Sequence, residues 1–273
     1  MNRNIILAAL AGGAALFGAS AQAQDWTGPY LGGHVGYGFQ SEDDDETITF
    51  DTNLDGQFGD TVLTSGGANA FTPGFCGGSA SGMAPASGCR DDDDGVVVGV
   101  RGGYDWQYGE WLFGVVADIS KAKVEDSVSA FSTTPASYTM TRELDWMAAA
   151  RLRGGYAMDR YLGYVTAGVA KASLDHSFST TNTVNTFPRD DDDKVTGYQL
   201  GAGVETRMMA NWTVGLEYLF TSLDDGDSSV RATGPAPAGN AFLLANASGT
   251  DFRRSDDDFE IQSVRLTSTY RFR

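Results

Sequence analysis

The chain has 273 residues, with 36 acidic and 19 basic side chains and a formal net charge of −17. This charge excludes a nucleic-acid-binding role, which needs a basic face to displace counterions from phosphate. The mean hydropathy of −0.24 excludes a helical membrane protein with many spans, and the 15 Phe, 11 Tyr and 5 Trp residues are too many for a disordered coil. A β-rich globular protein or a β-barrel remains.

The first segment has the pattern of a secretory signal peptide. Arg3 precedes an apolar stretch from Ile5 to about Ala19, and small residues close the segment at Ala21 and Ala23. A membrane-spanning helix is the alternative, but the apolar stretch is shorter than the roughly 20 residues that a span needs. We therefore predict a signal peptide over residues 1–23 and a mature chain over residues 24–273.

Two cysteines, Cys76 and Cys89, lie in a segment rich in Gly, Ser, Ala and Pro, with no histidine nearby. A zinc site would need four ligands, and a reactive thiol would need an activating base. Because export implies an oxidising compartment, the pair predicts a disulfide that ties a loop.

The mature chain contains eight segments in which apolar and polar residues alternate with period two, as in β-strands. In the clearest one, Val96, Val98 and Val100 share one face, and Arg101 and Asp105 share the other. The predicted strands span residues 30–39, 96–107, 111–120, 144–156, 161–174, 196–208, 212–221 and 264–272.

The connections between these strands separate a membrane barrel from a soluble β-sandwich. Short turns near residues 109, 159 and 210 alternate with long loops at 40–94, 120–141, 176–193 and 222–259. The strands also reach about 10 residues, the length that crosses a bilayer, whereas strands of globular proteins have about 5–6. We predict an all-β, eight-stranded antiparallel transmembrane β-barrel with short periplasmic turns and long acidic extracellular loops.

The polar faces of the strands carry charges of both signs. An eight-stranded barrel has an interior that side chains just fill, so these charges predict an ion-paired lumen rather than an open pore. Glu143 and Asp145 are assigned to this polar face, and Leu144 and Trp146 to the apolar face. The predicted lumen network consists of Arg101, Asp105, Asp118, Arg151, Arg153, Glu205, Arg207, Glu217, Arg265 and Arg271.

Short motifs at both ends of the mature chain resemble a known family. The segment from Asp25 to Gly33 reads DWTGPYLGG and continues into Gly36-Tyr37-Gly38, and it resembles the opening of the small outer-membrane β-barrels of Gram-negative bacteria. These are opacity-type, OmpA/OmpX-like surface proteins, often named "porin family". The end of the chain, from Thr269 to Phe272, resembles the last strand that such proteins present to the barrel-assembly machinery, although Arg273 follows the aromatic residue. The resemblance implies the bacterial outer membrane, with its lipid and lipopolysaccharide, and a surface or structural role.

Charge is distributed unevenly between the predicted loops and the predicted barrel. The four loops hold 25 acidic and 7 basic residues, whereas the rest of the mature chain holds 11 of each. Acidic runs at 42–46, 91–94, 190–193 and 256–258 flank predicted strands and are expected to lie near one another on the outer rim. Either divalent cations bridge them to lipopolysaccharide, or they form a solvated, self-repelling surface that keeps the loops extended. The second interpretation is favoured.

One loop segment matches the first half of an EF-hand calcium loop, with Asp51, Asn53 and Asp55 at the ligand spacing. Val62 stands at the twelfth position, where a bidentate acid belongs, although Asp60 lies close by. An Asn/Asp-rich turn is therefore favoured over a Ca²⁺ site. No other cofactor is predicted.

Neither histidine has the surroundings of a catalytic base. His34 lies in the glycine-rich first strand, and His176 precedes Ser177 at the start of a loop. We predict a non-enzymatic surface or structural protein that presents acidic loops, with adhesion or cation-bridged envelope contacts as candidate roles. A narrow porin-like diffusion channel is the alternative.

Overall fold

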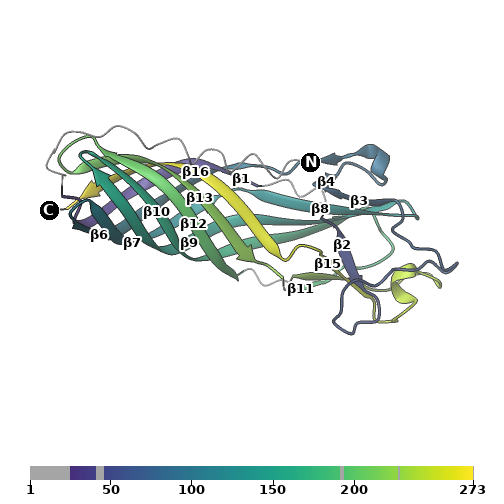
Figure 1. The fold of residues 1–273 in the computed structure, drawn as a ribbon. Coiled ribbons are helices and arrows are strands. Elements are labelled where there is room, and N and C mark those ends of the chain that lie inside the picture. The colour runs from purple at the N-terminus through teal and green to yellow at the C-terminus, as the bar shows by residue number, and fades with distance from the viewer. Residues whose placement is uncertain (1–24, 41–45, 191–193, 227, 273) are drawn as a thin grey trace.

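The computed structural model describes residues 25–40, 46–190, 194–226 and 228–272, so the predicted signal peptide lies outside the described residues. The chain forms a long barrel with a second folded part at one end (Figure 1). We call this second part the head. Within the described ranges, no helix is long and apolar enough to span a membrane.

Eight antiparallel strands close the barrel, as predicted. Each strand pairs with the next in the order β1-β6-β7-β9-β10-β12-β13-β16, and β16 returns to β1. The strands are β1 (Gly28–Phe39), β6 (Gly95–Tyr108), β7 (Trp111–Ala122), β9 (Ala136–Met158), β10 (Tyr161–Thr180), β12 (Lys194–Arg207), β13 (Trp212–Asp224) and β16 (Asp258–Arg271).

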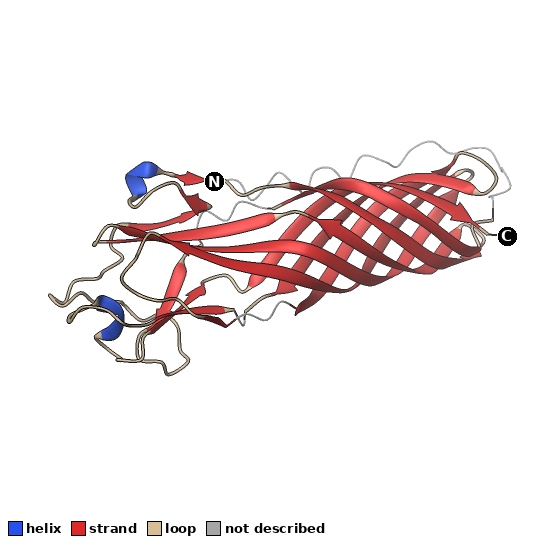
Figure 2. Ribbon diagram, turned by 180° about the vertical axis from the view of Figure 1, so that it is seen from behind, coloured by secondary structure: helices blue, strands red, loops and turns tan. Residues whose placement is uncertain are grey.

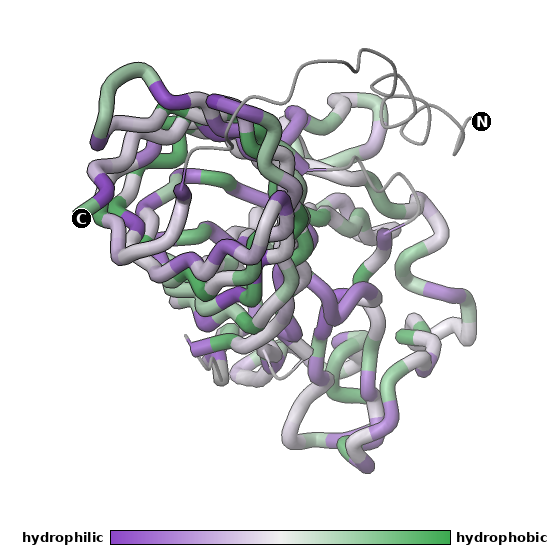
Figure 3. Tube along the Cα trace, turned by 60° about the vertical axis from the view of Figure 1, so that its left-hand side comes forward, coloured by the Kyte–Doolittle hydropathy of each residue, from purple (hydrophilic) through white to green (hydrophobic). Residues whose placement is uncertain are grey.

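Side chains alternate between the outside and the inside of the barrel. On β6, Val98 and Val100 are more than half exposed on the outer face, whereas Arg101 is 2% exposed in the lumen. The hydropathy of the barrel strands alternates in the same way along the trace (Figure 3). Glycine makes room inside at crowded points: a Cβ on Gly103 would lie 2.5 Å from the hydroxyl oxygen of Tyr30.

Two barrel strands continue far beyond their predicted ends. Strands β9 and β10 pair with each other over their full lengths, up to the pair Thr180 and Tyr138. Strand β8 (Glu125–Ser132) pairs with the outer part of β9, so the predicted loop at 120–141 is largely a β-hairpin. The loop prediction was wrong here because these residues pair with β9 and pack on a hydrophobic core. The alternation of polar and apolar residues reports neither of these contacts.

A β-bulge in β9 separates the barrel part of that strand from its head part. Ser173 pairs with Trp146 and Leu174 pairs with Leu144, so Asp145 is an extra residue in β9. One extra residue moves every following side chain to the opposite face. Leu144 therefore points inward and is 1% exposed, while Glu143 and Asp145 are outside, which corrects their predicted assignments.

The described residues of the head form small β-sheets and short 3₁₀ turns (Figure 2). A four-stranded sheet has the order β11 (Arg189–Asp190), β14 (Ser229–Ala232), β15 (Thr250–Arg254) and β2 (Ile48–Asp51). Strand β3 (Gly74–Gly77) pairs with β8, and β4 (Ser79–Ala80) pairs with β5 (Cys89–Arg90). The 3₁₀ turns are η2 (Pro85–Ser87) and η3 (Ala241–Leu243).

The head has its own hydrophobic core, rich in aromatic side chains. Phe252 is fully buried, and its ring centroid lies 5.0 Å from that of Phe50 and 5.2 Å from that of Phe242. All four predicted long loops contribute to the core, together with the outer end of β9, through Phe50, Phe71, Val128, Tyr138, Met140, Phe187, Val230, Phe242 and Phe252. The interpretation of extended, self-repelling loops was therefore wrong for the described residues, because burial of these rings outweighs the repulsion between surface charges.

Candidate functional site

The middle of the lumen holds a buried ion-pair layer. Arg101 and Arg151 both approach the carboxylate of Glu217, at 3.3 Å and 3.7 Å. Arg151 also contacts Asp118, and Arg265 lies 3.3 Å from the carboxylate of Asp118. Each of these five side chains is at most 2% exposed. Burial of charge at this density requires such pairing, since an unpaired charge would lose its hydration without compensation.

A second buried layer lies nearer the short turns. Arg153 and Arg271 each contact both Asp105 and Glu205, at distances from 2.8 to 3.4 Å. The guanidinium of Arg153 also lies over the ring of Tyr164, 3.8 Å from its centroid. The two layers contain nine of the ten residues of the predicted lumen network.

The tenth residue, Arg207, lies at the mouth of the barrel beside the N-terminal segment. Its guanidinium lies 4.6 Å from the ring of Trp26 and donates to the carbonyl oxygen of Asp25. Arg271 donates to the carbonyl oxygen of Trp26 at 2.8 Å, and the Trp26 ring is completely buried. Residues 25–27 therefore cover this end of the lumen, a feature that the sequence pattern did not indicate.

Charged residues that were assigned to the lumen but lie outside form only exposed pairs. Lys121 is 3.4 Å from Asp145, and Lys123 is 3.9 Å from Glu143, with each lysine side chain more than 70% exposed. The bulge in β9 accounts for their position.

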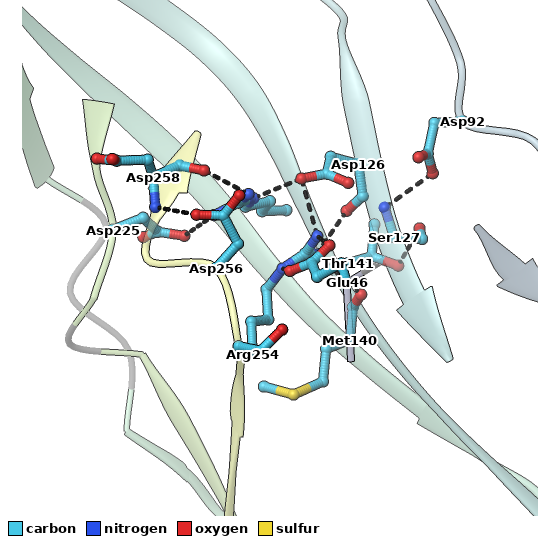
Figure 4. A network of polar contacts seen from close by, with 12 residues as sticks. Glu46, Asp92, Asp126, Ser127, Met140, Thr141, Asp225, Arg254, Asp256 and Asp258 are labelled. Atoms are coloured by element: carbon cyan, nitrogen blue, oxygen red, sulfur yellow. Dashed lines mark hydrogen bonds and ion pairs between the residues drawn. The ribbon is translucent and has the colours of Figure 1, made fainter. Parts of the chain in front are cut away.

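A second buried cluster joins the barrel to the head, and Figure 4 shows its arrangement. Arg254 lies between Glu46 and Asp126, with its Nε 2.7 Å from Glu46 and its Nη2 2.8 Å from Asp126. Arg142 contacts Asp126 at 2.7 Å and Asp225 at 3.4 Å. Burial would raise the pKa of Asp126, but Arg254 and Arg142 outweigh burial and hold it below its ordinary value.

Sequence reasoning missed this junction cluster. Arg254 stands out as a cation in a strongly acidic loop, and it alternates with the apolar Phe252 as an inward-facing strand residue does. That alternation was the available signal. The partners could not be identified because they come from β8, the segment before β2 and the segment after β13.

The acidic runs meet beside this cluster, as predicted for their described members. A cavity of about 250 Å³ is lined by Arg142 and by eight acidic residues: Glu46, Asp91, Asp92, Asp94, Asp126, Asp256, Asp258 and Glu260. Burial, followed by the nearby charge of Asp126, raises the pKa of Asp92 to about 7. Residues 42–45 and 191–193, which belong to the other acidic runs, lie outside the described residues.

The segment with EF-hand spacing forms a tight turn. The carboxylate of Asp51 accepts hydrogen bonds from the backbone of Leu54 at 2.6 Å and of Gly56 at 2.7 Å. Asp60 accepts from both the backbone and the hydroxyl of Thr52, and Asn53 donates to Asp55 at 3.1 Å. In the described part of the chain, no group of three or more His, Cys, Asp or Glu residues is arranged to hold a metal ion. The turn is the favoured interpretation, and Ca²⁺ binding by this segment stays the alternative to it.

The predicted disulfide is present between Cys76 in β3 and Cys89 in β5, with a Cα–Cα distance of 6.5 Å. It joins β3, which pairs with β8, to the hairpin of β4 and β5. This hairpin also contacts β8 directly, because the backbone of Ala80 in β4 donates to the hydroxyl of Ser129 in β8 at 2.9 Å.

The two histidines lie in different parts of the molecule. His34 is buried in the barrel, with Nε2 3.0 Å from the hydroxyl of Ser120. His176 belongs to the junction, where Nε2 lies 2.9 Å from the carboxylate of Asp225. Both histidines thus have a structural partner.

A closed barrel with an apolar outer face and an ion-paired interior is the architecture of transmembrane β-barrels of the outer-membrane type. The sequence matches the family of the outer membrane protein beta-barrel domain over residues 6–272, and the chain belongs to this family. The protein is therefore a bacterial outer-membrane protein.

Relatives include the 31 kDa outer-membrane immunogenic protein of Brucella melitensis, 28% identical over 60% of this chain and 73% of the relative. The 22 kDa outer membrane protein of Rhizobium leguminosarum bv. viciae is 33% identical over 46% of this chain and 51% of the relative.

Two solved structures also align with the fold. The attachment invasion locus protein Ail of Yersinia pestis has a TM-score of 0.33 and 12% identity, covering 90% of this chain and 99% of that chain. The outer membrane protease OmpT of Escherichia coli has a TM-score of 0.42 and 11% identity, covering 90% of this chain and 97% of that chain.

Proposed function

We propose that this protein is a non-enzymatic display protein, in which a filled barrel anchors a folded head at the cell surface. The observation that carries the proposal is the head core, to which residues from all four long connections contribute. Loops that only closed the barrel would not need a shared aromatic core. Such a core fixes a defined surface, as a protein that contacts other molecules requires.

The orientation is part of the proposal. Short turns of such barrels face the periplasm and longer loops face outward, which puts the head outside the cell. Residues 190–194 read DDDDK, the recognition sequence of enteropeptidase, and Lys194 is exposed at the start of β12. Enteropeptidase added to intact cells is expected to cut after Lys194. Cutting only after lysis would reverse the orientation.

The alternative of a diffusion channel is tested separately. The two ion-pair layers and the buried Trp26 support a lumen without an open path for solutes. In planar bilayers, the purified protein is expected to give no stable stepwise conductance. A variant with Trp26→Ala reports whether the N-terminal segment alone covers the mouth, and steady openings of the wild type would contradict the proposal.

The acidic cavity supports a cation-bridged contact with lipopolysaccharide as one role of the head. Its carboxylates are the oxygen ligands that Mg²⁺ and Ca²⁺ prefer. Binding of purified protein to lipopolysaccharide is expected to be stronger in Mg²⁺ than in EDTA, and to weaken in a variant with Asp91→Asn and Asp256→Asn. Equal binding in both buffers would exclude this role. Calorimetry with Ca²⁺ on the wild type and on Asp55→Ala tests the EF-hand-like segment independently.

Assembly by the barrel-assembly machinery is proposed for the C-terminal strand. Strand β16 ends beside Tyr270 and Phe272, whose ring centroids are 5.1 Å apart, whereas Arg273 lies outside the described residues. Phe272→Ala is expected to lower the amount of folded protein in the outer membrane. Deletion of Arg273 is expected to leave that amount unchanged or raise it.

A further inference from the structure

A groove on the head is made by four segments that are far apart in the sequence. It has a volume of about 360 Å³, within the range of roughly 300–1,000 Å³ that is common for small-molecule pockets. Its walls come from residues 64–70, the β8–β9 turn at 132–138, the segment 181–184 after β10, and residues 239–242 around η3. These segments lie in the head, at the end of the molecule away from the chain's C-terminus (Figure 1).

The lining of this groove is uncharged and combines hydroxyl and amide groups with apolar side chains. None of the described residues that line it is Asp, Glu, Lys, Arg or His, although the predicted loops together carry 25 acidic residues. Hydroxyl groups project from the turn at Thr133 and Thr134 and from Thr183, all exposed. A charged ligand would find no counter-charge in the groove, and an anion would also be repelled by the surrounding head.

The floor of the groove is aromatic and apolar. Tyr138 and Phe242 lie at its base with ring centroids 5.7 Å apart, and Ala136 and Ala70 lie beside them. Hydroxyl and amide groups around an apolar floor match a molecule that has many neutral hydroxyl groups and apolar C–H faces.

A network of asparagine side chains fixes the walls. Asn182 donates to the hydroxyl of Tyr138 at 3.0 Å and to Asn185 at 3.1 Å, and Asn240 donates to Asn185 at 3.0 Å. Asn240 also caps η3 by accepting from the backbone of Phe242. The network joins the segment after β10 to the segment before η3, so the groove is formed before a ligand arrives and binding orders few groups.

We propose that this groove binds neutral saccharide units, as found in uncharged surface glycans. The inference deepens the proposed display function, because it names the class of ligand that the exposed head would contact. Saccharide binding is measured on the purified protein, whereas display at the cell surface is measured on intact cells. The two proposals are therefore contradicted by different experiments.

The test measures binding of detergent-solubilised protein to immobilised neutral oligosaccharides of glucose, galactose, mannose and N-acetylhexosamines, followed by calorimetry on the strongest binder. Thr134→Asp introduces a charge at the wall, and Thr183→Trp fills the groove; both sites are exposed, so the head is expected to fold. Each change is expected to weaken binding by at least about tenfold. The matched control Thr61→Asp adds the same charge at an exposed site outside the lining and is expected to leave binding within about twofold.

Three outcomes would overturn the inference: no neutral oligosaccharide binds, Thr134→Asp and Thr61→Asp have equal effects, or sialylated and sulfated oligosaccharides bind in preference to neutral ones. Enteropeptidase cutting of intact cells reports the position of the head independently of all three. A positive binding result with a head inside the periplasm would overturn display but leave the saccharide site standing.

Discussion

The barrel and the head bury opposite kinds of side chain. Inside the barrel lie arginine–carboxylate layers such as that of Arg101 and Glu217, whereas inside the head lie aromatic rings, several of which pack edge to face against Phe252. The difference follows from the surroundings of each part. Lipid tails surround the barrel, so its apolar side chains can face outward, whereas water surrounds the head, so its apolar side chains are more stable when buried. Strand β9 belongs to both the barrel and the head, and between the two its bulge at Asp145 changes which alternate residues face inward.

The largest expected effect comes from breaking the lumen layers. Glu217→Ala leaves Arg101 and Arg151 without one of their carboxylate partners and removes the acceptor of the Tyr164 hydroxyl. Truncating one partner of a buried ion pair costs about 3–5 kcal/mol. Urea unfolding in micelles, followed by tryptophan fluorescence, measures the loss. Glu217→Gln keeps the volume and an acceptor, so it is expected to cost less, and a loss near zero in both would refute the account of the lumen.

Phe252→Ala is expected to lower the stability of the head by a comparable amount and to leave the stability of the barrel unchanged. Removing a fully buried Phe costs about 3–5 kcal/mol. Hydrogen exchange of peptides from β14 and β15 is expected to accelerate, while tryptophan-monitored unfolding stays unchanged, since all 5 tryptophans lie in the barrel or at its mouth. Equal destabilisation of both parts would show that they unfold as one unit.

Asp92 gives the head a pH dependence. Its pKa is raised from 3.8 to about 7, so the folded head holds a proton that the unfolded chain releases between these values. The ionised carboxylate therefore destabilises the head above that range, and the penalty disappears as the pH falls towards the unfolded value. Asp92→Asn is expected to stabilise the head by roughly 1–2 kcal/mol at about pH 8, after allowance for partial exposure, and to have little effect at about pH 4.

Hydrogen exchange of head peptides at both pH values, corrected for intrinsic exchange, measures this effect. The backbone of Ser127 donates to Asp92 at 2.8 Å, and an asparagine oxygen can accept the same bond. Asp93→Asn, at an exposed neighbour in the same run, serves as the control. Stabilisation that is the same at both pH values would exclude the ionisation of Asp92 as its cause.

The smallest effect is expected from an exposed ion pair of the barrel. Lys121 and Asp145 are 3.4 Å apart, but their side chains are 74% and 47% exposed. Lys121→Ala is expected to change stability by less than about 0.5 kcal/mol in the same urea experiment. A loss as large as that of Glu217→Ala would mean that ion pairs stabilise the barrel regardless of burial.

Much of the barrel could be predicted from residues alone. Strand alternation, as at Val98, Val100 and Arg101, reports which face of a strand each side chain occupies, and short turns report which strands are neighbours. The lumen network was found this way because period two holds along most barrel strands. The prediction from period two failed at Leu144, because a single inserted residue moves the following side chains to the opposite face without changing the composition of the strand.

The head could not be predicted in the same way. Phe71 and Phe242 stand in stretches of irregular sequence, where no period marks them as core residues. The junction cluster and the groove are assembled from segments up to 208 positions apart, such as Arg254 and Glu46. Acidic composition suggested repulsion, but it does not report apolar contacts between distant loops.

The residues alone were therefore enough to predict the eight strands, the inward and outward faces along most of their length, the disulfide and the location of the excess negative charge in the connections. The folded head formed by those connections could be seen only in three dimensions, because its core and the uncharged groove depend on contacts between segments that share no local pattern. Local periodicity follows from the geometry of one strand, whereas the head exists only when the closed barrel brings its four connections to the same end.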